Sequence, residues 1–267
     1  MLLVLVASRG INGLASVNPL IALVAGALTS AAAIAAYVWL TRRVEGREAD
    51  EVSLRNMWPG LFRGILLGAG LFTATILLIG MFGGWASVSW HSFGAFLVTL
   101  GLMASVAVSE ELLFRGVVYR ILEERAGTVI AVLASSLFFG AMHLVNEHAT
   151  PWGAVAIALE GGTLTAACFL LTRSLWLPIG LHFAWNATQS GVFGAPVSGA
   201  ESGDSGLLHL ALHTSKTALT GGTFGPEASL IAMLVCTVPA ILLLRRAHRA
   251  GRFRTGTLTG RLRARPE

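Results

Sequence analysis

The chain has 267 residues, of which 54% are hydrophobic and 12% are charged, and its mean hydropathy is +0.71. An ordinary soluble domain is about 45–50% apolar and about 25% charged, so this composition excludes the soluble classes and indicates an integral membrane protein. The formal net charge of +5 comes from the arginines that follow residue 244. They lack the interleaved aromatic residues of a nucleic-acid surface, and we expect no nucleic acid partner.

Seven apolar stretches are each long enough to cross a bilayer core roughly 30 Å thick. A bilayer offers the backbone no hydrogen bonds, and these stretches are continuous rather than alternating, so they are predicted to be helices and not barrel strands. The predicted fold class is all-α, a polytopic transmembrane helix bundle. The seven spans are expected near residues 18–41, 61–83, 93–114, 128–147, 152–172, 175–193 and 228–247.

The chain is predicted to form one transmembrane domain, residues 18–247, between an N-terminal extension of residues 1–17 and a basic tail of residues 248–267. The opening lacks the basic start of a signal peptide, and another full span follows it. Most Lys and Arg residues fall on the side of the tail, and only Arg9 and Lys216 fall on the other side. The positive-inside tendency therefore predicts a multi-pass protein of the cell membrane with its N-terminus outside and its C-terminus in the cytoplasm. The tail is expected to bind anionic lipids.

The longest polar insertion, residues 193–225, is predicted to lie outside the membrane. Within it, residues 207–216 are expected to form a short amphipathic helix that carries His209 and His213 one turn apart. Two histidines alone do not complete a metal site. We therefore interpret both as surface residues.

Ionisable side chains inside spans are rare and are functional candidates by default. The stretch SEELLFRG contains Glu111 and Arg115 four residues apart, which places them on one helix face in the order that favours an ion pair. Glu110 is turned about 100° away and cannot share that pairing comfortably. A glutamate without such a partner, in a poorly hydrated pocket, is suited to take a proton from water and return it to a leaving group. Glu110 is therefore the candidate base.

Two later spans carry further polar residues at one-turn spacing. Phe139 precedes His143, and His182 precedes Asn186, so the members of each pair share a helix face. A single membrane histidine is more often a helix–helix hydrogen-bond donor than a catalyst, and the Glu–Arg unit alone is equally well interpreted as structural. Three helices that each supply acid, imidazole or amide groups favour a shared site. Glu160, beside two glycines that allow close helix approach, is expected to hydrogen-bond across an interface rather than to line that site.

The residues Glu110-Glu111-x-x-x-Arg115, Phe139-x-x-x-His143 and His182-x-x-x-Asn186 form three motifs along the chain. In this order they resemble the three motifs of the CPBP family, which comprises type II CAAX prenyl endopeptidases and bacteriocin-processing intramembrane proteases. The likeness covers residues 93–191, and the flanking spans match only in being hydrophobic. The resemblance implies an intramembrane endopeptidase that hydrolyses a peptide bond of a membrane-associated protein or peptide, prenylated substrates included. The motif residues are Glu110, Glu111, Arg115, Phe139, His143, His182 and Asn186.

The resemblance also implies a role for each motif residue. Glu110 and His143 would activate the hydrolytic water, while His182 and Asn186 would support the site or stabilise the oxyanion. The family has been described both as metal-dependent and as glutamate-type, so the cofactor stays open. Zinc is the candidate, with Glu110, His143 and His182 as its ligands and an open fourth position. Supporting roles would fall to Glu111, Arg115 and Phe139.

The motif residues meet only if the third and fourth spans extend past the membrane as a hairpin. If these spans began at the membrane surfaces, Glu110 would lie near the cytoplasm and His143 near the outside. They lie at one depth if the third helix continues to about Glu124 and the fourth begins below the surface. The sequence therefore predicts a protruding hairpin and a catalytic cavity that opens toward the cytoplasm.

Other protease classes fit the sequence poorly. The chain has no His-Glu-x-x-His motif, and its two aspartates, Asp50 and Asp204, fall outside the predicted spans. The main alternative to an endopeptidase is a non-catalytic membrane scaffold or a bacteriocin-immunity protein with the same fold. Such a protein would tolerate the loss of Glu110, whereas the enzyme would not. A small proton-coupled transporter is a third alternative, against which the absence of an inverted repeat counts.

Overall fold

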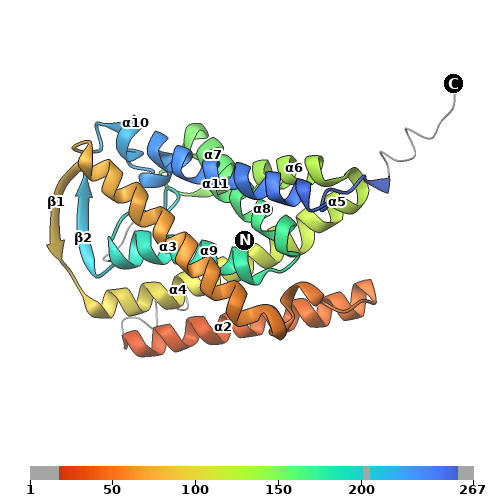
Figure 1. Cartoon of the computed structure of the whole chain (residues 1–267). Coiled ribbons are helices and arrows are strands. Elements are labelled where there is room, and N and C mark those ends of the chain that lie inside the picture. Colours follow the sequence, from red (N-terminus) through yellow and green to blue (C-terminus); the bar gives the residue numbers. More distant parts are fainter. Residues whose placement is uncertain (1–17, 201–204, 258–267) are drawn as a thin grey trace, which may run out of the picture.

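The computed structural model describes residues 18–200 and 205–257, and most of these residues are helical. Long helices pack against one another and form a bundle (Figure 1). The predicted all-α polytopic helix bundle is therefore confirmed. The predicted extension, residues 1–17, and residues 258–267 of the tail lie outside the described residues.

The elements follow one another as α2 (Pro19–Leu40), η1 (Thr41–Glu45), η2 (Asp50–Val52), η3 (Leu54–Asn56), α3 (Met57–Met81), β1 (Trp85–Trp90), α4 (Phe93–Glu111), η4 (Leu112–Tyr119), α5 (Arg120–Ala126), α6 (Thr128–Met142), η5 (His143–Val145), α7 (Pro151–Ile157), η6 (Ala158–Gly162), α8 (Thr163–Thr172), α9 (Trp176–Asn186), η7 (Ala187–Val192), β2 (Leu208–Leu212), α10 (Thr217–Thr220), η8 (Pro226–Ala228) and α11 (Leu230–Arg249). Of these, η1, η4, η6 and η7 are π-helical. The other η segments are 3₁₀ turns.

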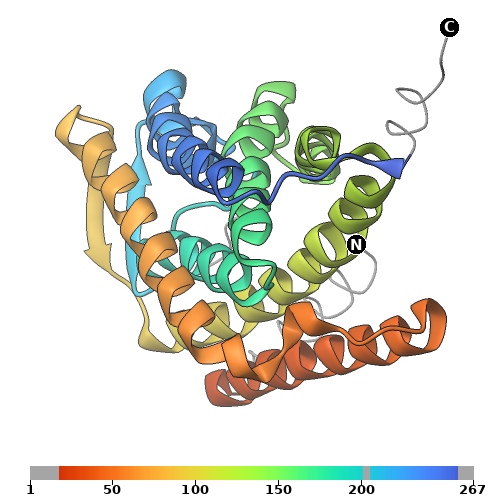
Figure 2. The ribbon, with the colours of Figure 1, turned by 45° about the vertical axis from the view of Figure 1, so that its right-hand side comes forward.

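Six helical segments of the described residues are long and apolar enough to cross a membrane. In α2 and α11 only 17% and 22% of the apolar window is buried inside the protein, against 72% in the segment formed by α7, η6 and α8. Outward-facing apolar side chains on the peripheral helices fit a lipid environment. The seventh predicted span, residues 175–193, is the shorter pair α9 and η7. Figure 2 shows α9 at the centre of the bundle, where it packs against α3, α4 and α8.

Glycines allow the central helix to approach its neighbours closely. A Cβ atom added to Gly64 of α3 would lie 2.4 Å from the Leu177 carbonyl oxygen and 2.9 Å from the Gly180 Cα atom of α9. Likewise, a Cβ atom on Gly26 of α2 would lie 2.0 Å from the carbonyl oxygen of Gly101 in α4. Small residues permit such backbone contact between membrane helices, where packing rather than water exclusion drives association. The positions of α9 and α2 thus depend on these glycines.

The predicted hairpin is present. The helix that starts at Phe93 continues through η4 and α5 to Ala126, and α6 begins at Thr128 after a turn at Gly127, where φ is +89°. Glu110 lies 16 residues before the end of the first arm, and His143 lies 15 residues after the start of the second. At 1.5 Å per residue, both are about 23 Å from the turn. The two arms therefore bring these residues to one level.

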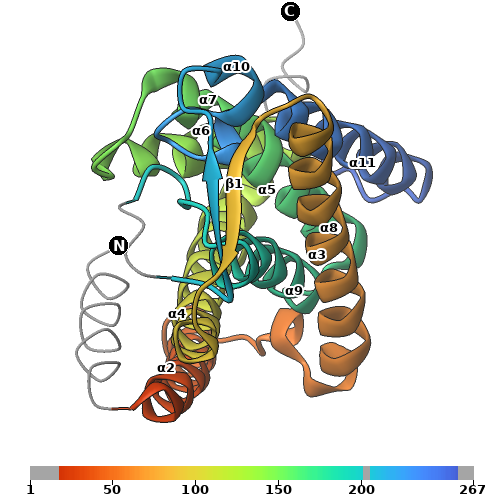
Figure 3. The ribbon, with the colours of Figure 1, turned by 90° about the vertical axis from the view of Figure 1, so that its left-hand side faces the viewer.

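A two-stranded antiparallel sheet closes the opposite end of the bundle. Strand β1 pairs with β2, with Ser89 opposite His209, and Figure 3 views this end of the molecule. The amphipathic helix predicted for residues 207–216 is therefore wrong. Strand β1 is far from residues 207–216 in the sequence and supplies the backbone hydrogen-bond partners of β2. The local sequence of residues 207–216 could not predict these partners. His209 and His213 are both exposed, as expected of surface histidines.

Several arginines gather at the end of the bundle that contains the Gly127 turn, and ion pairs join the helices there. We call this end the basic pole; its arginines are Arg47, Arg120, Arg125, Arg173 and Arg254. Glu123 is buried there and pairs with Arg173. It also accepts a hydrogen bond of 2.7 Å from the hydroxyl of Thr128. The backbone N–H of Thr128 in turn donates to the Arg254 carbonyl oxygen at 3.1 Å. The segment after α11 is therefore fixed to the hairpin turn.

Candidate active site

The buried centre of the site is an ion pair at the end of α4. The side chains of Glu111 and Arg115 are 0% and 1% exposed, and Arg115 donates to Oε1 of Glu111 at 3.0 Å. Arg115 also donates to the Gly162 carbonyl oxygen at 3.0 Å and lies over the Phe139 ring at 4.6 Å. The pair thereby joins α4 and η4 to α6 and to η6. The ion pair expected from the i, i+4 spacing is present.

His182 is attached to this centre from α9. Its Nδ1 atom lies 2.9 Å from Oε1 of Glu111, and because a carboxylate only accepts, Nδ1 carries the proton of this hydrogen bond. The opposite ring atom, Nε2, lies 3.9 Å from Oε2 of Glu110. That oxygen of Glu110 is buried and has no hydrogen-bond partner among the described residues. Glu111 therefore fixes the imidazole so that its free nitrogen faces Glu110.

His143 lies across the site at the start of η5, directly after α6. Its Nδ1 atom is 2.8 Å from the carbonyl oxygen of Phe139, which leaves Nε2 free. The Phe139 ring lies between the two imidazoles, with its centroid 4.8 Å from that of His143 and 5.9 Å from that of His182. Phe139 thus acts as a spacer between the histidines. His182, not His143, is the imidazole paired with Glu110.

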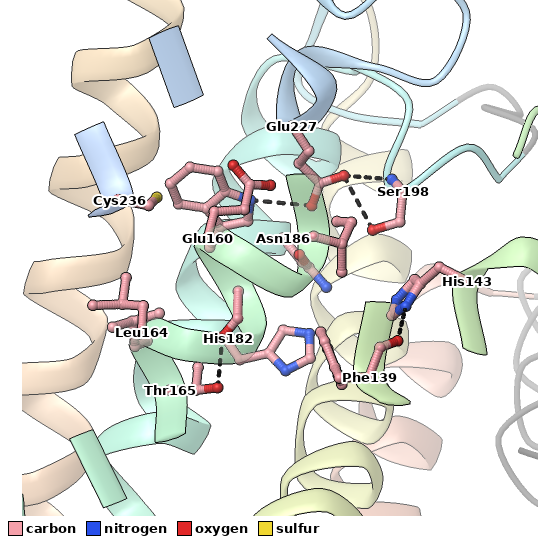
Figure 4. Close-up of a pocket in the computed structure, with 14 residues that line it drawn as sticks. Phe139, His143, Glu160, Leu164, Thr165, His182, Asn186, Ser198, Glu227 and Cys236 are labelled. Carbon is pink, nitrogen blue, oxygen red and sulfur yellow. Dashed lines mark hydrogen bonds between the residues drawn. The ribbon is translucent and has the colours of Figure 1, made fainter. Parts of the chain in front are cut away.

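A cavity lies beside these residues. Figure 4 shows polar side chains from several elements around it. Leu164, Leu181 and Trp185 form part of its apolar wall. Its polar lining includes His143, Glu160, His182, Asn186, Ser198 and Glu227. The cavity therefore brings together His143, His182 and the side-chain amide of Asn186.

Glu160 was expected at a helix interface, and that prediction is wrong. The close approach occurs at Gly162, where an added Cβ atom would lie 2.9 Å from the Cα atom of Ser136 in α6. Glu160 precedes this contact by two residues and faces the cavity instead. Its side chain is buried, and its Oε2 atom has no hydrogen-bond partner among the described residues. The glycines do allow close approach between helices, as predicted, but that contact lies on a different face of the helix from Glu160.

Glu227 is a site residue that the sequence analysis missed. Its carboxylate accepts hydrogen bonds from Nε1 of Trp185 and Nε2 of Gln189, each at 3.2 Å, and from the backbone and hydroxyl of Ser198. Burial raises the pKa of Glu227 above its ordinary value despite these donors. A signal was available, because Glu227 is the only charged residue between Lys216 and Arg245.

Three of the four π-helical segments adjoin the site. Segment η4 carries Arg115, η6 carries Glu160, and η7 directly follows Asn186. A π-helical turn adds a residue to the helical repeat and so redirects the side chains that follow it, and such turns are frequent at functional sites. The position of the side chains in the cavity therefore depends on local backbone conformation that 3.6-residue periodicity does not capture.

The polar lining of the cavity reaches the sheet end of the bundle rather than the basic pole. Ser198 and Glu227 come from the connection between η7 and α11, and Asn146, just after His143, donates to the Ser198 carbonyl oxygen at 2.7 Å. The sequence predicted a cavity that opens toward the basic side, and this lining lies at the other end. The side of the membrane on which the cavity opens stays a prediction.

The proposed zinc ligands do not form a metal site in the described part of the chain. No group of three or more His, Cys, Asp or Glu side chains there is close enough to hold a metal ion. Nδ1 of His182 is engaged by Glu111, and Nδ1 of His143 by a backbone carbonyl. The Phe139 ring lies between the two imidazoles. The residues as arranged here therefore do not fit a zinc ion.

The fold and the site define a multi-pass membrane protein with a partly buried Glu–His pair next to a cavity. Residues 92–188 match the family model described as type II CAAX prenyl endopeptidase Rce1-like. This segment contains all seven motif residues, and the match supports the CPBP/CAAX protease family. No curated protein and no solved structure matches the chain.

Proposed function

We propose that the protein is an intramembrane endopeptidase that hydrolyses a peptide bond of a membrane-associated protein or peptide. The observation that carries this proposal is the position of Glu110, whose unpartnered Oε2 atom lies 3.9 Å from Nε2 of His182. A separation beyond 3.5 Å between two polar atoms is suited to a bridging water. The family match of residues 92–188 supports the same reaction class.

In this mechanism Glu110 removes a proton from water held between it and His182, and the water oxygen attacks the carbonyl carbon of the scissile bond. The carbonyl oxygen then becomes negatively charged, and the side-chain N–H of Asn186 is suited to stabilise it. The tetrahedral intermediate collapses with cleavage of its C–N bond, and Glu110 returns the proton to the leaving amine. His182 orients the water through Nε2, a role that the family resemblance had given to His143.

Glu111 and Arg115 act in this proposal as positioning residues. Glu111 selects the His182 tautomer in which Nε2 accepts a hydrogen bond, and Arg115 stabilises Glu111 as a carboxylate. His143 faces the cavity from the other side of Phe139 and is suited to hold the substrate peptide through its free Nε2 atom.

We also propose the side from which substrate arrives. The basic pole carries most of the cationic residues, and the positive-inside tendency places it in the cytoplasm with the C-terminus. The polar end of the cavity then lies toward the outer leaflet. A transmembrane or lipid-anchored protein exposed on the outer side fits this arrangement better than a prenylated cytoplasmic peptide. The arginines at the basic pole are suited to contact anionic lipids of the inner leaflet.

The test is cleavage of a library of membrane-spanning peptides by the purified protein and by Glu110→Gln. We expect Glu110→Gln to lose at least about 100-fold in rate, since general base catalysis contributes roughly 10²–10⁴-fold. The matched control is Glu124→Gln, an exposed glutamate on the same arm of the hairpin. A chelator is expected to leave the rate unchanged. Equal product from the wild type and Glu110→Gln would refute the role of Glu110, and retention of partner binding without cleavage would favour the non-catalytic alternative.

A further inference from the structure

The sheet end of the cavity contains two carboxyl groups that the proposed reaction does not use. Glu160 is 2% exposed and Glu227 is 3% exposed, and both line the cavity. They come from different elements, η6 and η8. Figure 4 shows them at one end of the cavity, with His182 at the other end. Two acidic side chains therefore line the same cavity.

The two carboxyl groups differ sharply in their hydrogen bonding. Glu227 accepts from Trp185, Gln189 and Ser198, and such a set of donors favours the ionised carboxylate. Glu160 has no comparable support, since its buried Oε2 atom has no partner among the described residues. An unpartnered polar atom in an interior needs an explanation, and a functional role or a bound water or ion is among the usual ones. Glu160 itself lines the cavity, so a molecule bound there can supply a partner for its carboxyl group.

The chain supplies no permanent cation for this end of the cavity. No lysine or arginine is among the described residues that line it. The nearby Arg115 is engaged by Glu111 and by the Gly162 carbonyl oxygen. Two buried carboxylates cannot both stay ionised close together unless a positive charge compensates them. A bound ligand can provide that charge.

We propose that Glu160 and Glu227 form a subsite that binds a cationic side chain of the substrate, a lysine or an arginine close to the scissile bond. The inference rests on the proposed endopeptidase function and names its substrate class. A buried carboxylate binds an ammonium or guanidinium group by a short, charge-assisted hydrogen bond. Glu227, already held by its donors, shapes the subsite, and the Glu160 carboxylate pairs with the cationic group of the substrate. An uncharged side chain there would leave Glu160 unpaired.

The experiment measures binding apart from cleavage. The probes are fluorescent transmembrane peptides that carry one lysine, scanned along the segment, and matched peptides with norleucine in its place, which keeps the aliphatic chain and removes the ammonium group. Their affinities are measured for Glu110→Gln protein in lipid nanodiscs. At the preferred position we expect the lysine peptide to bind about tenfold more tightly, the size of a hydrogen bond to a charged group.

The variant Glu160→Gln, added to Glu110→Gln, should abolish this preference. It keeps the shape of the side chain, and no hydrogen bond to its Oε2 atom is lost. The control pair Glu110→Gln and Glu124→Gln should keep the preference, and thermal unfolding checks that each variant is folded. Equal affinity for the lysine and norleucine peptides at every position would overturn the subsite.

The two proposals fail differently. Cleavage by the wild type without any lysine preference would leave the endopeptidase standing and remove the subsite. A lysine preference that Glu160→Gln abolishes, in a protein that cleaves no peptide, would keep the cationic subsite and remove the hydrolytic role of Glu110.

Discussion

Replacing Arg115 with methionine isolates the contribution of the buried ion pair at the centre of the site. Both side chains of the pair are essentially inaccessible, at 1% and 0% exposure. Without the arginine, Glu111 keeps its hydrogen bond to His182 but loses its compensating charge. The Gly162 carbonyl oxygen loses its bond to Arg115, whereas that of Gly161 keeps its bond to Thr165.

The expected magnitude follows from these contacts. Removing one partner of a buried pair costs about 3–5 kcal/mol because an uncompensated charge stays behind. A buried acceptor left without a donor costs about 1–3 kcal/mol by itself. We therefore expect Arg115→Met to lower the free energy of unfolding by about 3–5 kcal/mol. The double variant Glu111→Gln and Arg115→Met should lose less than the sum of its single changes, because no lone charge remains buried.

The assay is reversible unfolding in mixed detergent micelles, followed by tryptophan fluorescence. The control is Arg125→Met, which changes an exposed arginine of the hairpin and should alter the free energy of unfolding by no more than about 0.5 kcal/mol. A loss below about 1 kcal/mol for Arg115→Met, or strictly additive effects in the double variant, would refute the reasoning.

Further changes test packing, titration and orientation. Gly64→Ala should lower the free energy of unfolding by about 1–3 kcal/mol, because its Cβ atom would meet the backbone of α9, whereas Gly70→Ala, with nothing within 4 Å, should be neutral or stabilising in the same measurement. Burial raises the pKa of Glu227 in the folded protein. The wild type should therefore lose stability relative to Glu227→Gln as the pH rises from about 4.3, the ordinary pKa of glutamate, through the pKa of the folded state. Unfolding measured at several pH values checks this trend. A slope of opposite sign would contradict the assigned burial effect. His148→Cys should react with an impermeant maleimide on intact cells and Arg125→Cys only after permeabilisation, and the reverse pattern would invert the proposed orientation.

The hairpin shows how far local patterns lead. Its length followed from the charged residues after Tyr119, and the matching levels of Glu110 and His143 followed from helical rise alone. Spacing of four residues also anticipated the pairing of Glu111 with Arg115. These features depend on separations of a few residues along one helix or on one turn, and periodicity fixes such distances.

Contacts between segments that are far apart in the sequence could not be predicted in the same way. Glu227 and Ser198 are part of the cavity because the connection after η7 folds back into the bundle, and β2 exists because β1 supplies its partner. The periodicity of the sequence predicts neither contact. The wrong interpretation of Glu160 had a similar origin, since a glycine pair describes one helix face and says nothing of what covers the next.

The sequence by itself determined the membrane environment, the all-α class and the residues of the three motifs, because hydrophobic length and helical spacing are local properties. Only the tertiary structure decided which imidazole faces Glu110, that a phenyl ring lies between His143 and His182, and that the cavity continues to the sheet end. The physical reason is that these relations depend on helix rotation and close approach. Glycine contacts and π-helical turns set both, and a hydropathy pattern contains neither.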